Sequence, residues 1–331
     1  MNKIKIAFIG AGHDHAFSNI NRFKDATDLY EVMGYHIPED EALQEKPEII
    51  EKLFEGMKKL SLDEILQDTQ IEAVVIETVD KILTKYALLA AKAKKHIFMD
   101  KPGSGSLEEF ENLISEIKKN NLVFETGYMY RYNPFVIKLK EEIKKGNFGE
   151  ILGIEAQMNC LHPKDKRDWL ADYPGGMMHF LGCHLVDLIY SIQGEPKNII
   201  PLSRRTGLGD ALGVDFGMAV FEYENSVSFA KTSGVEYGGF HRRNLTVVGS
   251  KKTVELCPFE CFDPDGKMFT EKTEYSVENW QNRGEKDKVY FDRYEKMVRS
   301  FYNYVKGIEE NPVTPDYELN LYKLVLKACG K

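Results

Sequence analysis

The sequence predicts a two-domain α/β protein, in which a parallel sheet flanked by helices precedes an open, mostly antiparallel sheet. Three observations predict this fold. Short apolar runs alternate with helical segments in residues 1–126, alternating apolar and polar residues replace that pattern in residues 127–331, and a glycine-containing turn follows the first apolar run. The length of 331 residues also fits about two domains.

Five apolar runs are the expected strands of the first domain. The run Ala73–Ile76 is apolar throughout, as expected for a strand that is buried on both faces of its sheet. Strands that alternate with helices of this length are typical of right-handed βαβ units. The expected strands are Lys3–Ile9, Glu31–Ile37, Ala73–Ile76, Ile97–Met99 and Val123–Thr126, and the expected helices are His15–Phe23, Ser61–Leu66, Thr84–Ala93 and Leu107–Lys119.

Beyond residue 126 continuous apolar runs give way to alternating apolar and polar residues. This alternation is typical of strands in a sheet with one open face. The expected strands are Ile151–Asn159, Asp215–Tyr223, Ser226–Thr232, Arg243–Val248 and Thr253–Leu256. Helices are expected at Asn133–Lys145, His179–Ser191, Tyr290–Glu309 and Tyr317–Cys329. We expect His179–Ser191 and Tyr290–Glu309 to cover the second sheet, and the last helix to dock back on the first domain.

Composition excludes several classes of function. A net charge of −8 argues against broad binding to nucleic acid or to anionic membranes, because either partner would repel the chain on average. We expect neither a signal peptide nor a membrane helix, since no apolar stretch approaches the roughly 20 residues that a span needs. The five cysteines suggest neither a disulfide framework nor a zinc site. A reducing, cytoplasmic location fits best.

The turn Ile9-Gly10-Ala11-Gly12-His13-Asp14-His15 follows the first strand and opens the first helix. In this context a glycine pair predicts a Rossmann dinucleotide site, because Gly10 permits the tight turn and Gly12 lets a pyrophosphate approach the helix N-terminus. His15 stands where the third glycine of the pattern usually lies, so we expect a slightly remodelled turn.

The end of the second strand should supply an acid for the adenosine ribose. His36 occupies that position, with Glu39 and Asp40 slightly later, and no basic residue follows before Lys46. A 2′-phosphate would therefore meet acids and little positive charge. The sequence favours NAD over NADP as the cofactor.

The two histidines of the turn also raise the question of a metal. One residue separates His13 from His15, and only Asp14 lies nearby in sequence as a third ligand. We therefore expect no metal site. The histidines are expected to line the cofactor phosphates or to cap the helix.

Four further segments resemble the Gfo/Idh/MocA oxidoreductases, the family of glucose–fructose oxidoreductase and inositol dehydrogenase. Asp100-Lys101-Pro102 is similar to the family's Glu-Lys-Pro signature, and the segments at 130–134 and 146–151 resemble its R-[FY]-x-P and G-x-[IF]-G-x-[IL] motifs. The segment 174–187 resembles its G-G-G-x-L-x-D-x-G-x-H-x-x-D helix. Any one motif is weak, but four in family order are strong.

The resemblance implies a Rossmann domain followed by an α/β domain whose open sheet often forms dimer or tetramer contacts. It also implies reversible hydride transfer between NAD(P) and a hydroxyl or keto group of a sugar, a polyol or a related small molecule. The partners implied are a sugar-like small molecule and further copies of the chain. The residues expected at the cofactor are Gly10, Ala11, Gly12, His13, Asp14, His15, His36, Thr78, Val79, Asp80, Asp100 and Lys101.

Two residues carry the expected chemistry. Lys101 matches the family's lysine, and His184 matches its histidine. Oxidation of an alcohol needs a base for the hydroxyl proton, which His184 could accept, while Lys101 could stabilise alkoxide character. The two roles are exchangeable. Phe180 stands where inositol-dehydrogenase-like members carry an aspartate, which puts an aspartate-assisted mechanism in doubt.

Other residues are candidates for the substrate. Tyr128 and Arg131 follow the fifth strand and should border the cleft, although Arg131 could equally form an ion pair. Trp169, in an expected loop, offers a flat face to a sugar ring. Asp187 lies three residues after His184 and could equally be a structural hydrogen-bond partner.

Two alternative functions stay open. A relative of such enzymes can oxidise a sugar transiently so that elimination cleaves a glycosidic bond without net redox, and Phe180 leaves room for this chemistry. A cofactor-binding regulator without catalytic activity would be free to lose Lys101 and His184, which this chain retains.

Overall fold

The computed structural model describes residues 2–43, 45–277 and 279–331. The chain divides into two compact units. The first unit runs to Met129 and also includes Tyr294–Tyr322, whereas the second contains Tyr130–Arg293 and Lys323–Lys331. The division expected between residues 126 and 127 lies near this boundary, and the segment Tyr294–Tyr322, which includes α9 (Glu295–Val305), belongs to the first unit.

The first unit is built on a five-stranded parallel sheet with the order β2-β1-β3-β4-β5. Its strands are β1 (Ile4–Ile9), β2 (Tyr30–His36), β3 (Ala73–Ile76), β4 (His96–Met99) and β5 (Phe124–Thr126). The helices between them are α1 (Ala16–Asp25), α2 (Pro47–Leu53), α3 (Leu62–Gln67), α4 (Asp80–Lys92) and α5 (Leu107–Asn120). This is the parallel α/β domain that the sequence predicts, with α2 as an additional short helix.

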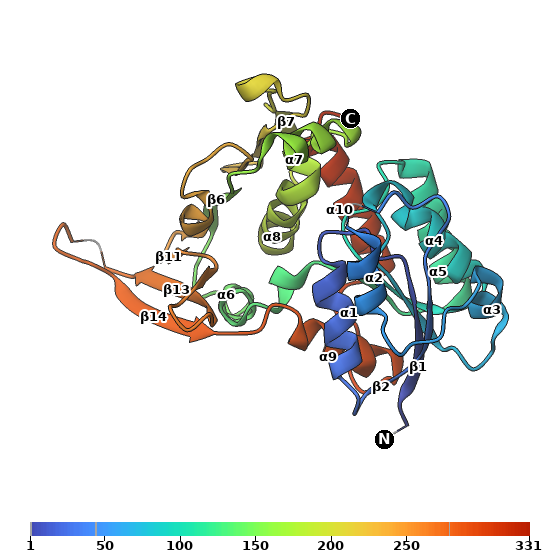
Figure 1. Ribbon diagram of the computed structural model, residues 1–331. Helices are drawn as coiled ribbons and strands as arrows, with labels where there is room; N and C mark the ends of the chain where they lie inside the picture. Colours follow the sequence, from blue (N-terminus) through green and yellow to red (C-terminus); the bar gives the residue numbers. More distant parts are fainter. Residues whose placement is uncertain (1, 44, 278) are drawn as a thin grey trace. The chain divides into compact units, whose positions relative to one another are not determined.

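Two C-terminal helices complete the first unit. Phe301 of α9 (Glu295–Val305) contacts Phe23 of α1 and Phe98 of β4, and α9 lies beside α1 in Figure 1. The expectation that this helix covers the second sheet was wrong, because an apolar stripe predicts burial without identifying the sheet that buries it. Tyr322 of α10 (Pro315–Ala328) stacks on Phe110 of α5, so the last helix does pack on the first unit up to that residue.

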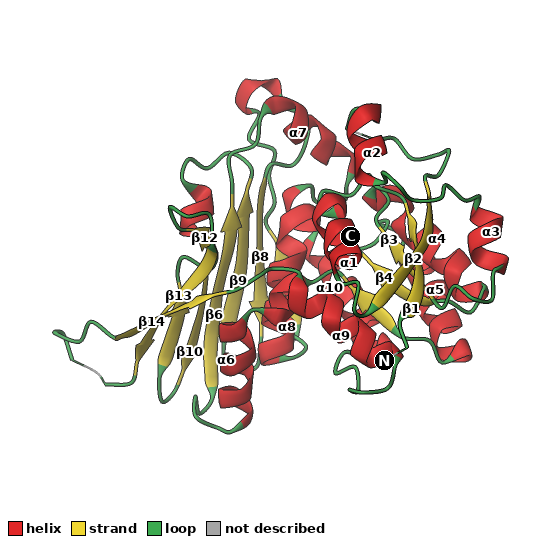
Figure 2. Ribbon diagram, turned by 60° about the horizontal axis from the view of Figure 1, so that its bottom comes forward, coloured by secondary structure: helices red, strands yellow, loops and turns green. Residues whose placement is uncertain are grey.

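The second unit is built on a nine-stranded mixed sheet, which Figure 2 shows as a row of arrows. Only β6 and β9 pair in parallel among its described ladders, so the expectation of a mostly antiparallel sheet is confirmed. Its strands are β6 (Ile151–Asn159), β7 (Asn198–Pro201), β8 (Phe216–Glu222), β9 (Val227–Ser233), β10 (Asn244–Gly249), β11 (Thr253–Leu256), β12 (Cys261–Phe262), β13 (Met268–Tyr275) and β14 (Glu285–Tyr290).

Helices cover one face of this sheet. Buried residues of β6 and β9 alternate with more exposed ones, and α8 (Cys183–Gln193) contacts both strands. A further helix, α6 (Pro134–Lys144), begins at Asn133, whose side chain caps it by accepting from the amides of Phe135 and Val136. Strands β7, β12, β13 and β14 were not expected, because their charged or short segments lack the alternation that marks the other strands.

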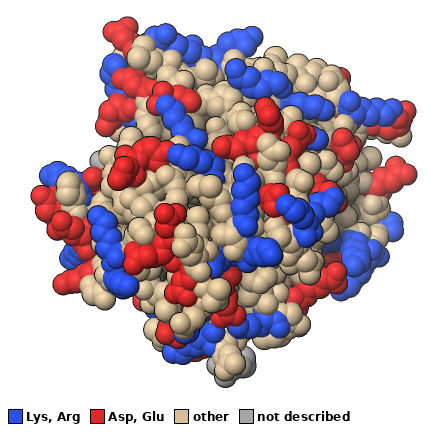
Figure 3. Space-filling view, turned by 90° about the vertical axis from the view of Figure 1, so that its right-hand side faces the viewer, with Lys and Arg blue, Asp and Glu red and all other residues tan. Residues whose placement is uncertain are grey.

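Surface charge and helix length relate to the nucleic-acid and membrane binding that the sequence argues against. Basic and acidic side chains are interspersed on the face drawn in Figure 3, in keeping with the net charge of −8. Among the described residues, the helices are either too short or too polar to cross a bilayer.

Candidate active site

Three turns of the first unit meet at the carboxyl edge of its parallel sheet. They follow β1, β3 and β4, and they contain Gly10–Gly12, Thr78–Asp80 and Asp100–Lys101, respectively. The strand order changes direction between β1 and β3, because β2 lies on one side of β1 and β4 lies beyond β3. Ligands of open α/β sheets bind at such a switch point.

The turn after β1 requires its first glycine. Gly10 has φ +83°, and a Cβ there would lie 2.7 Å from the backbone of Thr78. Its N–H donates to the carbonyl of His36 (2.8 Å), and the N–H of His13 donates to that of Glu77 (3.0 Å). The turn is therefore fixed against both neighbouring strands.

Backbone amides of this turn form an anion-binding nest with the turn after β3. The amides of Ala11, Gly12 and Val79 all donate to the carboxylate of Glu41, which comes from the segment between β2 and α2. Because one acidic group accepts from all three amides, the nest fits an anion such as the pyrophosphate of a dinucleotide. Glu41 was not expected at this site, although it belongs to the acidic run Glu39-Asp40-Glu41 that follows the second strand.

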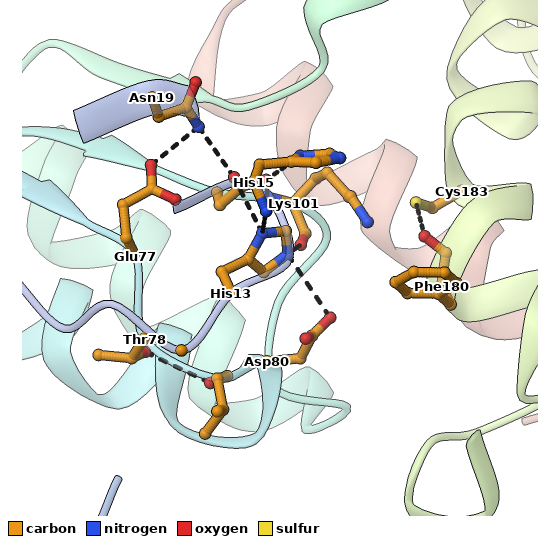
Figure 4. A network of polar contacts seen from close by, with 12 residues as sticks. His13, His15, Asn19, Glu77, Thr78, Asp80, Lys101, Phe180 and Cys183 are labelled. Atoms are coloured by element: carbon orange, nitrogen blue, oxygen red, sulfur yellow. Dashed lines mark hydrogen bonds and ion pairs between the residues drawn. The ribbon is translucent and has the colours of Figure 1, made fainter. Parts of the chain in front are cut away.

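The two histidines of the turn contact Asp100 instead of capping α1. Nδ1 of His13 lies 3.0 Å from one Asp100 oxygen, and Nδ1 of His15 lies 3.2 Å from the other. Asn19 of α1 donates to Glu77 (2.9 Å), as Figure 4 shows, and also to Asp100 (3.0 Å). The side chain of His15, which precedes α1, makes no capping hydrogen bond.

Burial and neighbouring charges shift the pKa values of this network in different directions. Burial would raise the pKa of Asp100, but the two histidines hold that pKa well below its usual range. Burial, reinforced by the charge of Asp100, raises the pKa of Glu77. Burial would lower the pKa of His13, but Asp100 and Asp80 outweigh it and raise that pKa, whereas burial prevails at His15 and lowers its pKa to about 4. The network thus favours one ionised carboxylate beside a cationic His13.

In this cluster Asp100, and not Asp14, is the third potential metal ligand beside the two histidines. His13, His15 and Asp100 together could hold a metal ion. Their separations of 3.0 and 3.2 Å are also those of hydrogen bonds, with one imidazole on each Asp100 oxygen. Nε2 of His13 meets the carbonyl of Lys101 (3.1 Å), which orients its ring. Hydrogen bonding therefore accounts for the contacts of Asp100 with the two imidazoles.

Lys101 and Asp80 lie next to this network. The side chain of Lys101 is among the most completely buried in the chain, and its backbone N–H donates to Asp100 (2.7 Å). Asp80 is buried at the start of α4, 3.9 Å from Nε2 of His13, and burial raises its pKa. The expected cofactor residues Thr78, Val79, Asp80, Asp100 and Lys101 thus share one edge of the sheet with the glycine turn.

Two expected cofactor residues have other surroundings. Nδ1 of His36 lies 3.1 Å from the carbonyl of Leu60, so its ring is engaged with the segment beside β2. The side chain of Asp14 is exposed. Asp40, the other acid considered for the ribose, is bound by Lys85 and Tyr86 at 2.6 Å each.

In the second unit, His184 is buried near the start of α8, directly after the short π-helix Met178–Gly182. Its ring packs edge-on against Tyr130, with the two centroids 4.8 Å apart. The Tyr130 hydroxyl donates to Glu260 (2.5 Å), which also pairs with Arg243 and Arg293. A buried polar network thereby fixes one wall around the imidazole.

Arg131 and Asp187, two residues expected to contact substrate, form a buried ion pair with each other. Nε of Arg131 lies 3.0 Å and Nη2 lies 2.8 Å from Oδ1 of Asp187, and both side chains are almost fully buried. This is the structural alternative that the sequence left open for both residues. Tyr128, also expected at the substrate, is buried in the first unit, whereas Arg131 belongs to the second.

Trp169 belongs to an aromatic cluster of the second unit. It ends a short helix, α7 (Lys164–Trp169), where the sequence analysis expected a loop. Its ring lies 4.4 Å from that of Tyr173 and 5.4 Å from that of Phe180, and Nζ of Lys166 lies 3.6 Å above it. The carbonyl of Phe180 accepts from the thiol of Cys183 (Figure 4). Phe180 thus contributes an aromatic wall where an acid was expected.

Gly12→Ala is expected to weaken dinucleotide binding about ten-fold or more, with a smaller effect on stability. A Cβ at Gly12 would lie 2.7 Å from the Glu41 oxygen that fills the nest and 2.5 Å from Cγ1 of Val79, so it would occupy the space of an anion. NADH fluorescence titration measures the effect. Gly56→Ala, in the same unit, is the control for a loss of stability that leaves the nest intact, because Gly56 has open space around it but a φ of +78° that strains an alanine. Unchanged binding in Gly12→Ala would contradict the position of the nest.

Two family models match the chain. Residues 4–128 match the oxidoreductase family with an NAD-binding Rossmann fold, named GFO_IDH_MocA, and residues 136–255 match the GFO/IDH/MocA C-terminal domain. The matches follow one another in order and together cover most of the chain.

Individual relatives and solved structures are similar to this chain over nearly its whole length. The chain is 25% identical to myo-inositol 2-dehydrogenase of Thermotoga maritima over 94% of this chain and 91% of that protein. Levoglucosan dehydrogenase in complex with NADH and levoglucosan superimposes with a TM-score of 0.77 at 16% identity, over 99% of this chain and 98% of that one. A structure from Desulfitobacterium hafniense, described as an NADPH-dependent oxidoreductase, gives 0.78 at 18% identity, over 100% and 95%.

Proposed function

Because the chain belongs to the Gfo/Idh/MocA family of oxidoreductases, we propose that it transfers hydride between a nicotinamide dinucleotide and a hydroxyl or keto group of a sugar or polyol. The observation that carries this proposal is the amide nest of Ala11, Gly12 and Val79 at the same sheet edge as Lys101. The nicotinamide cofactor would supply the hydride chemistry when bound. The name of the myo-inositol dehydrogenase relative supports the substrate class.

His184 is proposed as the group that accepts the hydroxyl proton, and Lys101 as its electrostatic partner. Lys101 is suited to this role by burial, because an ammonium stabilises a developing alkoxide most strongly where water is excluded. His184 is suited because it is buried and its ring packs in a T-shaped contact with that of Tyr130, which restricts the orientation of the imidazole. Either group can hold the proton at its nitrogen, so the two roles remain exchangeable.

NAD is the proposed cofactor, in preference to NADP. The acids Glu39, Asp40 and Glu41 follow β2, where a 2′-phosphate would lie, and they would repel it. Asp40 already binds Lys85, which therefore does not present an unpaired positive charge. Titration with NADH and NADPH tests this choice, and tighter binding of NADPH would overturn it.

A panel of cyclic polyols and sugars tests the reaction itself. Purified protein is expected to bind NADH and to change absorbance in the reduced-nicotinamide band with at least one member of the panel. His184→Gln should lower kcat and remove the alkaline rise of the pH–rate profile, because glutamine cannot take a proton. A pH profile that is unchanged in this variant would reject His184 as the base.

A second reaction is favoured by one observation, the aromatic wall of Phe180 and Trp169 where the family carries an acid. Such a wall packs on the apolar face of a sugar ring. It would suit a glycoside that is oxidised transiently, cleaved by elimination and reduced again. Release of the leaving group without net NADH, together with solvent-proton exchange beside the carbonyl, would distinguish this reaction from simple dehydrogenation.

Self-association through the open face of the second sheet is proposed as well. Val220 of β8 pairs with Phe229 of β9, and both side chains are only half-buried in the single chain. Covering them would remove apolar surface from water. Phe229→Glu should therefore lower the mass measured by light scattering to that of one chain. An unchanged mass would show that the chain does not associate through this face.

A further inference from the structure

Glu41 lies inside the nest that the glycine turn provides. Its Oε1 accepts from the amides of Gly12 (2.9 Å) and Val79 (3.0 Å), and both of its oxygens lie 3.3 Å from the amide of Ala11. The side chain is 9% exposed, so the carboxylate is largely withdrawn from water. A side chain of the chain itself therefore occupies three donors that would bind an anionic ligand.

The same donors cannot serve Glu41 and a phosphate at once. Each amide carries a single hydrogen, and the three amides converge on one carboxylate. The space above Gly12 is also filled, because a Cβ there would come within 2.7 Å of Oε1 of Glu41. A pyrophosphate that uses this nest must first displace the carboxylate.

We propose that Glu41 is a built-in competitor for the cofactor phosphates, which closes the amide nest in the free protein and leaves it when a dinucleotide binds. The proposal rests on the dinucleotide site proposed above. It makes Glu41 a determinant of cofactor affinity, whereas an acid after the second strand was expected only to bind the ribose.

The surroundings of Glu41 allow this exchange. It lies between β2 and α2, outside regular secondary structure, and the neighbouring Asp40 is held by Lys85 and Tyr86 at 2.6 Å each. The backbone at residue 40 is thus tethered, while the Glu41 side chain is bound only by the nest among its described hydrogen bonds. Rotation of one side chain would open the site without movement of the sheet.

Burial and neighbouring charges weaken the binding of the Glu41 carboxylate by the amide nest. Burial raises the pKa of Glu41 to about 7 despite the three amide donors, and the charge of Asp40 adds to this effect. Glu77 at the end of β3 and Tyr86 of α4 also face it electrostatically. The nest therefore holds the ionised side chain weakly, whereas a pyrophosphate keeps its charge throughout this pH range.

The pH dependence of cofactor binding follows from these charges. Below about pH 7 Glu41 is neutral in the nest, which is the form that burial favours, whereas above that pH it is ionised and is held weakly. NADH affinity of the unmodified protein should therefore rise as the pH rises toward about 7, because the raised pKa means that protonation favours the buried side chain over the displaced one. Glu41→Gln should show a flatter profile, because its amide side chain does not titrate.

Direct binding measurements test the competition. Glu41→Ala should bind NADH about ten-fold more tightly than the unmodified protein in a fluorescence titration, because the nest is then open. Glu48→Gln is the matched control, since Glu48 is an exposed acid at the start of α2, which follows the Glu41 segment, and NADH affinity should not change in this variant. Thermal melting checks that each variant is folded. Equal or weaker binding by folded Glu41→Ala would overturn the proposal.

A second measurement needs no cofactor. The amide resonances of Ala11, Gly12 and Val79 should titrate with a midpoint near pH 7 in the unmodified protein and lose that titration in Glu41→Gln. Absence of this titration would reject occupancy of the nest by Glu41, whatever the binding data. If the titration is present but neither NADH nor NADPH binds even to Glu41→Ala, the proposed dinucleotide function fails and competition for it is overturned, while occupancy stands.

Discussion

Lys101→Met is expected to lower kcat about 100- to 10,000-fold, with a smaller effect on NADH affinity. Lys101 follows β4 at the edge of the sheet that carries the amide nest, and its side chain is 1% exposed. A buried ammonium stabilises negative charge that develops on the substrate oxygen, and methionine fills a similar volume without that charge. Single-turnover kinetics and NADH titration together separate the loss of chemistry from a loss of binding.

Lys95→Met is the matched control for this variant. Lys95 lies at the other end of β4, is 5% exposed, and donates to the carbonyls of Asp68 (2.5 Å) and Ile71 (2.9 Å). Its replacement should cost about 1–3 kcal/mol of unfolding free energy and leave the rate unchanged. If Lys101→Met keeps the full rate, or if both variants lose it equally, Lys101 has no chemical role.

Sequence reasoning predicted the first unit well because each of its rules is local. A short, fully apolar run such as Ala73–Ile76 predicts a strand buried on both faces, and a glycine turn after an apolar strand predicts the start of a helix. Identifying the partner of α9 needed long-range information. The aromatic residues of α9 suit either sheet, and only their packing on Phe23 and Phe98 selects the first.

The candidate site was predictable in its backbone and less so in its side chains. Turns at the ends of β1, β3 and β4 must meet because parallel strands end at one edge. Nothing in the spacing of His13 and His15 indicated that Asp100, which is 85 residues away from His15, would bind both rings. Glu41 reaches the nest from a segment without periodicity, so no pattern could assign its contact.

The pairing of Arg131 with Asp187 is another long-range contact that no sequence pattern could assign. Replacement of Arg131 carries the largest expected loss of stability. Arg131→Met should lower the free energy of unfolding by about 3–5 kcal/mol, because it leaves the carboxylate of Asp187 buried without its cation. Urea denaturation measures this loss. Lys118→Met is the control, since Lys118 pairs with Asp316 on the surface, where an ion pair contributes at most about 1 kcal/mol.

The double variant Arg131→Met/Asp187→Leu distinguishes an ion pair from a substrate contact. Removing both charges should recover most of the stability lost in Arg131→Met, because no uncompensated charge then remains buried. If the pair only supports the fold, the double variant will keep the substrate KM of the unmodified protein. A stable double variant whose KM rises more than ten-fold would instead show that Arg131 or Asp187 contacts the substrate, which is the other role that the sequence leaves open.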